Sequence, residues 1–373
     1  MVFSNRLIIL TTTSLGILSA LLVWDPLPGG GDDRLREADV LMIDGGATGP
    51  ESFAFDAGGG GPYTGVSDGR ILRWGFEGVG WVEYATPYGY LREECEGSHN
   101  PEKEHICGRP LGLRFDERTG DLYIADAYLG LLVVGHGGGT ASPLVGEVGG
   151  VALRFTNSVE VDQKTGVVYF TDSSRRFQRR NFISSIITGD DTGRLLKYDP
   201  KTGQTSVLLD GLAFPNGLSL TKDGSSLLIS ETTTCRVLKY SLSGDPPATT
   251  PEVFTGLPGF PDNIRRSQRG GYWVAIHMKR GKLLRFLLSV MPWTWVVFER
   301  FPNMFLRLQW FYSMLGRWRG HALALRLGED GKVLEVLGSG GGGRLRVLSE
   351  VDERNGTLWI GSVMVPFVGV YKL

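Results

Sequence analysis

The chain has 373 residues, of which 42% are hydrophobic, 10% aromatic and 21% charged, so it is not disordered and has enough apolar residues for a large core. The 39 Lys and Arg residues against 40 Asp and Glu residues give a formal net charge of -1, which provides no overall positive field for nucleic acid. The 54 glycines follow no collagen repeat and indicate many tight turns, as in β-rich proteins.

The first predicted element is an uncharged, mostly apolar run over residues 7–24, preceded by Arg6 and followed by Asp25. Such a run at the N-terminus indicates entry into the secretory pathway. It is barely long enough to span a bilayer and contains the polar patch 11–14, so a cleaved signal peptide and an uncleaved membrane anchor both stay open. We assign residues 1–30 to this signal and residues 31–373 to the folded domain.

The chain has three cysteines, Cys95, Cys107 and Cys235. In an oxidising lumen, a disulfide between Cys95 and Cys107 would hold the polar loop between them. Metal binding by this pair is disfavoured, because no second Cys/His pair stands at ligand spacing. Cys235 adjoins an apolar strand, which predicts a buried thiol outside this pair.

One sequence motif recurs along the chain: a strand with alternating apolar residues, a polar turn with Asp and Gly, and a second apolar strand. Residues 111–124 and 157–170 share its register, and their 46-residue spacing is near that of a four-stranded propeller blade. Further copies begin near Glu51, Asn216, Asp262 and Ser349. Six copies predict an all-β fold, a six-bladed β-propeller, because a closed ring leaves no exposed sheet edge. The alternative, a β-sandwich, would not explain a repeat of this period.

The longest interval between copies contains an insertion at about 283–320, with Trp, Phe, Leu and Arg at loosely helical spacing. We interpret it as a helical cap over one face of the propeller. It would either pack on the ring and shape a pocket, or dip into the membrane interface near the N-terminal segment.

The inner strand of each blade begins at the central channel, so the repeat starts should converge on one axis. Four of the six starts carry a carboxylate or an amide, and one more amide follows the last of them: Glu51, Asn157, Asn216, Asp262 and Asn263. Oxygen ligands of mixed charge suit Ca²⁺. Each Asn or Asp alone could serve a turn, but four equivalent positions favour a shared metal site.

His277 ends the strand that follows Asp262, so it is a candidate acid or base near the metal; the alternative is a structural histidine. The arginines at 175–176 and 179–180 are interpreted as a solvated loop. Asn355 begins the glycosylation sequon Asn355-Gly356-Thr357, whose position in a tight turn disfavours occupancy.

Several phrases, at 49–56, 63–70, 168–174, 193–200 and 231–237, resemble those of plant strictosidine-synthase-like proteins. The resemblance runs from about residue 45 to the C-terminus. It implies a six-bladed propeller, entry into the endoplasmic reticulum as a lumenal or membrane protein, often with delivery to the vacuole, and a disulfide between Cys95 and Cys107.

Strictosidine synthases of that family join tryptamine to secologanin in a Pictet–Spengler condensation, with a channel Glu as acid and base. The resemblance puts Ser349 where that Glu should be, and a hydroxyl cannot replace a carboxylate in proton transfer at neutral pH. Glu350, one residue on in a strand, is expected on the opposite face. A condensing enzyme of alkaloid biosynthesis is therefore an alternative and not the leading hypothesis.

Paraoxonases, gluconolactonases and diisopropyl fluorophosphatase are related calcium hydrolases. The set of Glu51, Asn157, Asn216 and Asp262 resembles their metal ligands, Asn263 matches an extra paraoxonase ligand, and His277 resembles a pocket histidine. The other paraoxonase histidine would fall near Asp126, where this chain has none.

The leading hypothesis is a calcium-dependent hydrolase of esters or lactones, in which Asp262 or His277 acts as base or nucleophile. A propeller that only binds a partner is the remaining alternative.

Overall fold

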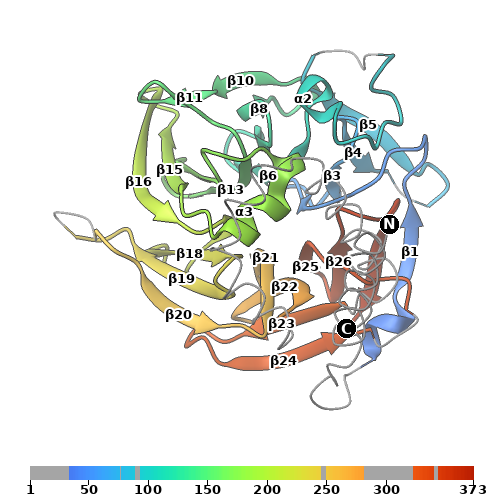
Figure 1. Cartoon of the computed structure of the whole chain (residues 1–373). Coiled ribbons are helices and arrows are strands. Elements are labelled where there is room, and N and C mark those ends of the chain that lie inside the picture. Colours follow the sequence, from blue (N-terminus) through green and yellow to red (C-terminus); the bar gives the residue numbers. More distant parts are fainter. Residues whose placement is uncertain (1–32, 76, 89–92, 245–248, 281–321, 340–342) are drawn as a thin grey trace, which may run out of the picture.

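The computed structural model describes residues 33–75, 77–88, 93–244, 249–280, 322–339 and 343–373. Six sheets surround a central axis as the blades of a propeller (Figure 1). The predicted six-bladed, all-β architecture is confirmed. The predicted signal at 1–30 and the predicted cap at 283–320 lie outside the described residues. Within the described part of the chain, no helix has the length and apolar character needed to cross a membrane.

The strands of the first three blades, from the axis outward, share one antiparallel pattern. Blade 1 contains β2 (Phe53–Ala54), β3 (Tyr63–Gly65), β4 (Ile71–Trp74) and β5 (Trp81–Thr86), with β9 (Gly139–Thr140) parallel to β5 at its edge. Blade 2 contains β6 (Pro110–Phe115), β7 (Leu122–Asp126), β8 (Gly130–Val134) and β10 (Ser142–Val145). Blade 3 contains β13 (Thr156–Val161), β14 (Val168–Asp172), β15 (Gly193–Asp199) and β16 (Gln204–Leu212).

The other three blades follow the same pattern. Blade 4 contains β17 (Pro215–Leu220), β18 (Ser226–Glu231), β19 (Arg236–Ser241) and β20 (Glu252–Gly256). Blade 5 contains β21 (Gly259–Arg266), β22 (Tyr272–Lys279), β23 (Leu323–Leu327) and β24 (Val333–Gly338). Blade 6 contains β25 (Glu350–Arg354), β26 (Thr357–Gly361), β27 (Phe367–Lys372) and β1 (Asp39–Met42).

Short elements connect the blades. They are the hairpin β11 (Glu147–Val148) and β12 (Val151–Ala152), and the helical turns η1 (Arg34–Glu37), α2 (Glu104–Cys107), η2 (Arg179–Asn181) and α3 (Phe182–Thr188). The sequence repeats did not predict α3, which lies near the axis in Figure 1.

The ring closes by pairing the two ends of the described chain. Strand β1 forms the outer edge of blade 6, antiparallel to β27, with Asp39 opposite Val370 and Met42 opposite Phe367. This pairing satisfies the backbone groups that an open ring would leave unpaired. It escaped the repeat analysis because β1 precedes the first copy of the repeat.

The recurring turn has a local cause. Asp116 accepts the backbone N–H two residues on at 2.9 Å, and Gly120 closes the turn with φ 77°. Asp162 and Gly166 repeat this arrangement at 2.9 Å and φ 82°. Asp supplies the side-chain acceptor and Gly the left-handed backbone, so the same motif produces the same hairpin in blades 2 and 3.

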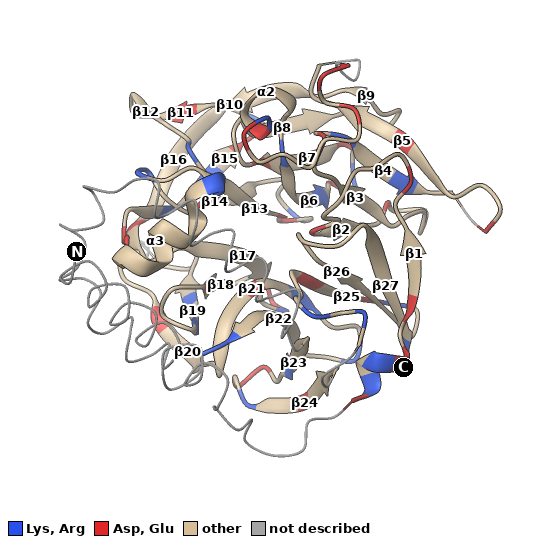
Figure 2. Ribbon diagram, turned by 45° about the vertical axis from the view of Figure 1, so that its right-hand side comes forward, with Lys and Arg blue, Asp and Glu red and all other residues tan. Residues whose placement is uncertain are grey.

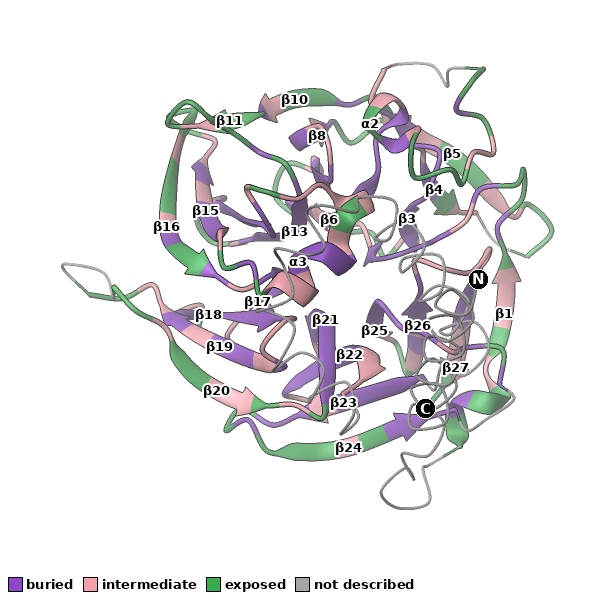
Figure 3. Ribbon diagram, viewed as in Figure 1, coloured by how far each residue is buried: buried purple, intermediate pink, exposed green. Residues whose placement is uncertain are grey.

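The apolar core lies between neighbouring blades. One buried cluster joins Ala125 and Leu131 of blade 2 to Val159 and Phe170 of blade 3, and similar clusters fill the other blade boundaries. The inner and middle strands are accordingly buried (Figure 3). The inner strands are therefore held firmly enough to position side chains on the axis.

The predicted disulfide between Cys95 and Cys107 is present, with Cα atoms 5.6 Å apart. Cys107 ends α2 and stands two residues before Arg109, so the disulfide fixes the chain that enters β6. Cys235 is buried and is not part of the disulfide, as predicted.

Candidate metal centre in the channel

The predicted channel residues lie at one end of the inner strands. Each precedes its strand or falls within the strand's first four residues: Glu51, Leu111, Asn157, Asn216, Asp262 and Ser349. Two glycines allow neighbouring strands to approach closely here. A Cβ on Gly112 would lie 2.8 Å from the Asn157 carbonyl oxygen, and one on Gly217 would lie 2.6 Å from Asn263 Cα.

The orientation of Asn157 follows from its hydrogen bonds. Its Nδ2 donates to the Ser173 hydroxyl at 3.0 Å, and that hydroxyl donates its own hydrogen to the Pro215 carbonyl at 2.7 Å. Ser173 can therefore only accept from the amide, which assigns nitrogen to that side of Asn157. The Oδ1 atom is buried with no hydrogen-bond partner among the described residues.

Asn216 has the same hydrogen-bonding arrangement in the next blade. Its Nδ2 donates to Thr232 Oγ1 at 3.3 Å, and Thr232 donates to the Pro261 carbonyl at 2.7 Å. Its Oδ1 is likewise buried and, within the described part of the chain, unpaired. Two neighbouring blades thus hold an amide so that its oxygen lacks a partner, which is unfavourable unless a ligand supplies one.

Glu51 adds a buried carboxylate whose Oε2 also finds no partner in the described residues. Burial, and next the nearby Asp262 carboxylate, raise the pKa of Glu51 to about 8, although Arg109 and Arg179 oppose this. A cation placed between the two carboxylates would reverse the shift and favour the ionised form of Glu51.

Asp262 pairs with the one histidine that the sequence placed beside it. His277 Nδ1 lies 3.3 Å from Asp262 Oδ2, and the side chains are 12% and 8% exposed. The ring of Phe182, the first residue of α3, lies 6.4 Å from the imidazole. The imidazole is therefore oriented by a carboxylate and an aromatic ring beside the channel.

These residues fit a calcium ion. The oxygens of Glu51, Asn157 and Asn216 are buried and unpaired within the described structure, and Asp262 adds a second carboxylate. Carboxylate and amide oxygens are the donors that Ca²⁺ prefers. No group of three or more His, Cys, Asp or Glu able to hold a metal occurs among the described residues, which is consistent with a site in which half the donors are amides. Asn263 is buried beside them, and its backbone N–H donates to the Ser349 carbonyl at 2.9 Å.

The structure also shows a cationic cluster that the sequence did not suggest. Arg179 Nη1 donates to Glu104 at 2.6 Å, and the Tyr128 hydroxyl donates to the other oxygen of Glu104 at 3.0 Å. Arg109 is fully buried and donates to the Gly49 carbonyl at 2.9 Å. Burial, and then the neighbouring Arg179, lower the pKa of Arg109 to about 10.

The interpretation of residues 179–180 as a solvated loop was wrong for Arg179, whose side chain is only 17% exposed. The reason is its ion pair with Glu104, which stands 75 residues earlier in the disulfide-bonded segment. Arg180 is more exposed and pairs with Glu102 at 2.7 Å. Charged residues that are so far apart in the chain give no local signal of their contact.

An apolar cluster adjoins the same end of the channel. Its buried members are Leu111, Ala127, Phe155 and Phe214, and Tyr128, Phe182 and Ile186 pack against them. Through Phe182 and Ile186, α3 supplies part of this cluster.

Two residues at the start of blade 6, Ser349 and Glu350, make hydrogen bonds to the neighbouring blades. The Ser349 hydroxyl donates to the Glu51 carbonyl at 2.7 Å. Glu350 accepts from Arg265 Nε at 2.7 Å and from the Phe53 N–H at 2.6 Å. Asp126 lies where the second pocket histidine of a paraoxonase would fall. Its carboxylate accepts the Arg109 N–H at 2.7 Å and also accepts the Tyr128 N–H of the following turn. None of these contacts provides a general acid in the place of Ser349.

Comparison with known proteins decides the family. A family model described as strictosidine synthase matches residues 157–245, and one described as strictosidine synthase-like, N-terminal, matches residues 32–74. Protein STRICTOSIDINE SYNTHASE-LIKE 10 of Arabidopsis thaliana is 52% identical over 352 residues, which cover 93% of this chain and 91% of that protein. The chain belongs to the strictosidine-synthase-like family. Protein STRICTOSIDINE SYNTHASE-LIKE 2 of the same plant is 48% identical over 88% of each chain.

Solved structures show that the fold of this strictosidine-synthase-like protein is shared more widely. A gluconolactonase from Xanthomonas campestris superposes with a TM-score of 0.56 at 16% identity, covering 91% of each chain. Regucalcin from Agrobacterium tumefaciens, described as a calcium-binding protein, gives a TM-score of 0.52 at 12% identity, covering 89% of this chain and 90% of that one. At these identities the likeness establishes the propeller fold alone.

Proposed function

We propose that this strictosidine-synthase-like protein is a calcium-dependent hydrolase of esters or lactones. The observation that carries the proposal is the pair of amide oxygens of Asn157 and Asn216, held unpaired beside Glu51 and Asp262. The propeller fold shared with a gluconolactonase and with a calcium-binding regucalcin supports it.

Glu51, Asn157, Asn216 and Asp262 would hold the ion, with Asn263 beside them. When bound, calcium supplies a Lewis acid that polarises a substrate carbonyl and stabilises the developing oxyanion. The remaining chemistry belongs to the protein. His277, oriented by Asp262 at 3.3 Å, is placed to accept a proton from water, and Asp262 would stabilise the imidazolium. Asp262 as the base or nucleophile is the other assignment.

The surroundings indicate which substrates would bind. Tyr128, Phe182 and Ile186, which pack on the buried cluster and stay partly exposed, would offer apolar contact, which favours an ester or lactone with an aliphatic or aromatic portion. Condensation of the strictosidine-synthase type receives no support from Ser349, whose hydroxyl donates to the Glu51 carbonyl.

We also propose that the protein works in the secretory pathway, in the endoplasmic reticulum or the vacuole. The apolar run at 7–24 and the disulfide, which persists in oxidising compartments, support this. Membrane contact through the N-terminal segment and the insertion at 283–320, and glycosylation of Asn355, remain predictions. Imaging a C-terminal fluorescent fusion tests the location, and a cytosolic signal would contradict it.

The test of function compares wild-type protein with Asn157→Ala and Asp262→Ala. Calcium binding is measured by calorimetry, and turnover is measured on a panel of esters and lactones. We expect both variants to lose both properties, and Asn100→Ala, which changes an exposed amide, to keep them. Turnover that survives in either channel variant would sink the proposal. Calcium binding by the wild type without turnover of any panel member would favour a binding scaffold instead.

A further inference from the structure

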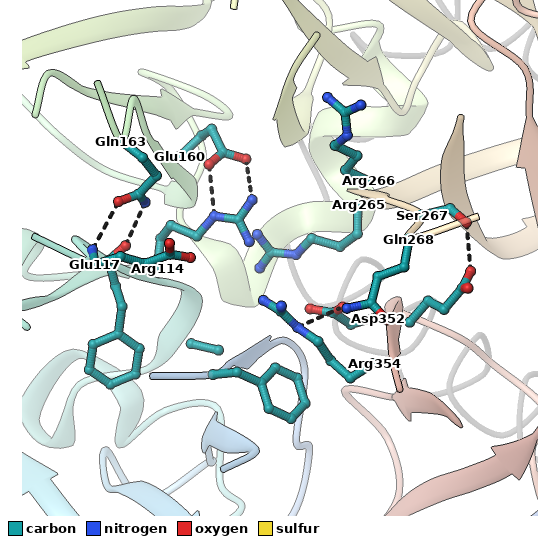
Figure 4. Close-up of a pocket in the computed structure, with 14 residues that line it drawn as sticks. Arg114, Glu117, Glu160, Gln163, Arg265, Arg266, Ser267, Gln268, Asp352 and Arg354 are labelled. Atoms are coloured by element: carbon teal, nitrogen blue, oxygen red, sulfur yellow. Dashed lines mark hydrogen bonds and ion pairs between the residues drawn. The ribbon is translucent and has the colours of Figure 1, made fainter. Parts of the chain in front are cut away.

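A second polar site lies at the opposite end of the channel. A cavity of about 230 Å³ opens where the inner strands end, lined by residues of blades 1, 2, 3, 5 and 6 (Figure 4). Arg266, which lines it, is four residues beyond Asp262 on β21, so the two sites are separated by roughly 13 Å at 3.3 Å per residue. Charged residues of both signs lie along β21 and β25 (Figure 2). The cavity is therefore distinct from the candidate metal centre.

Two arginines at this cavity are firmly neutralised. Arg114 donates from Nε and Nη2 to the two oxygens of Glu160, both at 2.7 Å. Arg265 is 2% exposed at its side chain and donates from Nε to Glu350 at 2.7 Å. Its Nη1 is buried and has no partner among the described residues. One donor of this second arginine is thus left over at the cavity.

Two other residues, Arg354 and Asp352, form only a long ion pair with each other. Arg354 Nε lies 3.9 Å from Asp352 Oδ1, which is too long for a hydrogen bond. Neither side chain makes a hydrogen bond to any residue that the structure describes, although Asp352 is 4% exposed and Arg354 Nε is buried. The guanidinium of Arg354 stacks instead over the Phe55 ring at 5.0 Å. Figure 4 shows Arg354 and Asp352 side by side, with Arg265 next to them.

The hydrogen bonds that these groups do not make within the described structure define the ligand that would satisfy them. The donors of Arg354 and Arg265 require an anionic or carbonyl acceptor, and a carboxylate matches a guanidinium best. Asp352 requires a hydrogen-bond donor from the same molecule. Arg266 adds a further weakly paired cation, because its nearest carboxylate, Glu329, is 3.9 Å away. Water could meet single hydrogen bonds, but it matches the planar fork of a guanidinium less well than the two oxygens of a carboxylate do.

We propose that this mouth of the channel binds a small carboxylate that carries a hydroxyl or ammonium group next to it. The carboxylate contacts Arg354 and Arg265, and the hydroxyl or ammonium group donates to Asp352. A cavity of about 230 Å³ admits a molecule of only a few heavy atoms, such as a 2-hydroxy acid or an amino acid.

Calorimetry on the full-length protein tests this with four matched probes: lactate, alanine, propionate and lactamide. Lactate or alanine is expected to bind, and which of them binds more tightly identifies the donor that Asp352 prefers. Propionate, which lacks the donor, should bind about tenfold more weakly, and lactamide, which lacks the charge, should not bind. Absence of binding by all four probes, or equal binding of propionate and lactate, overturns the proposal.

Two variants locate the site. Arg354→Gln should weaken the binding of lactate or alanine at least tenfold, whereas Arg36→Gln, at an exposed position, should leave it unchanged. Asp352→Asn keeps the side-chain shape and should reduce the preference for lactate or alanine over propionate. If the Arg354→Gln protein does not fold, the Asp352→Asn protein provides the test of the site. Unchanged binding in a folded Arg354→Gln protein overturns the assignment, and Asn157→Ala should leave the binding of these probes intact.

Discussion

The Ser173 hydroxyl accepts a hydrogen from Asn157 at 3.0 Å and donates its own to the Pro215 carbonyl at 2.7 Å. Ser173 therefore positions the Asn157 amide without being a candidate ligand itself. Ser173→Ala removes the acceptor, so the amide is free to rotate, and we expect calcium affinity to fall about tenfold or more. Calorimetry measures the loss, with exposed Ser243→Ala as the control. Unchanged affinity in a folded Ser173→Ala protein would show that Oδ1 is not a ligand.

Glu51 makes calcium binding depend on pH. Its pKa is raised from 4.5 to about 8 in the fold, so the folded state holds a proton that the unfolded state loses between these values. Metal-free stability should consequently fall as pH rises through this window. Calcium needs the carboxylate, so the rise in Tm on adding calcium should grow from about pH 6 to about pH 8.5. Glu51→Gln should abolish both trends, and a calcium effect independent of pH would contradict this assignment.

Arg179 and Arg180 form a matched pair of variants. Arg179→Gln leaves the buried Glu104 without its closest cation and should lower the free energy of unfolding by on the order of 2 kcal/mol. It also removes a charge that opposes the raised pKa of Glu51, so calcium binding should require a higher pH. Arg180→Gln breaks an exposed pair with Glu102 and should cost less than about 1 kcal/mol. Urea unfolding compares the two, and equal losses would mean that burial of the Glu104 cluster has no energetic consequence.

The disulfide between Cys95 and Cys107 closes a loop with a sequence separation of 12. Replacing both cysteines with Ser should lower the free energy of unfolding by about 3 kcal/mol, because the unfolded chain regains freedom. Urea unfolding with and without reductant measures this. Reductant should destabilise the wild type and leave the double variant unaffected. A double variant as stable as the wild type would show that packing alone holds α2.

The sequence predicted the ring because each blade is encoded locally. The polar residue and the Gly of a turn, such as Asp116 and Gly120, lie within one hairpin, so their pattern repeats visibly along the chain. The candidate ligands could be proposed for the same reason, since each stands at a fixed place in its repeat. The partners of the two amides, Ser173 and Thr232, also recur at the same separation of 16 residues, a signal that the sequence contained.

Contacts between distant segments could not be predicted in this way. Glu104 and Arg179 each resemble a surface charge until the fold brings them together, and their 75-residue separation follows no repeat. The absence of a hydrogen bond between Arg354 and Asp352 depends on the 3.9 Å between their side chains, which the residue types alone do not give. The helix α3 is short and irregular in pattern, so it gave no periodic signal.

The pairing of β1 with β27 has a consequence for how the protein is made. Synthesis proceeds from the N-terminus, so β1 leaves the ribosome before β27, the strand with which it pairs, and β27 (Phe367–Lys372) is the last strand of the ring to be made. Throughout translation, the nascent chain carries an exposed β-edge at each end of an incomplete ring. Closure of the ring thus awaits synthesis of β27, and a chaperone that shields β1 until then would have a defined binding target.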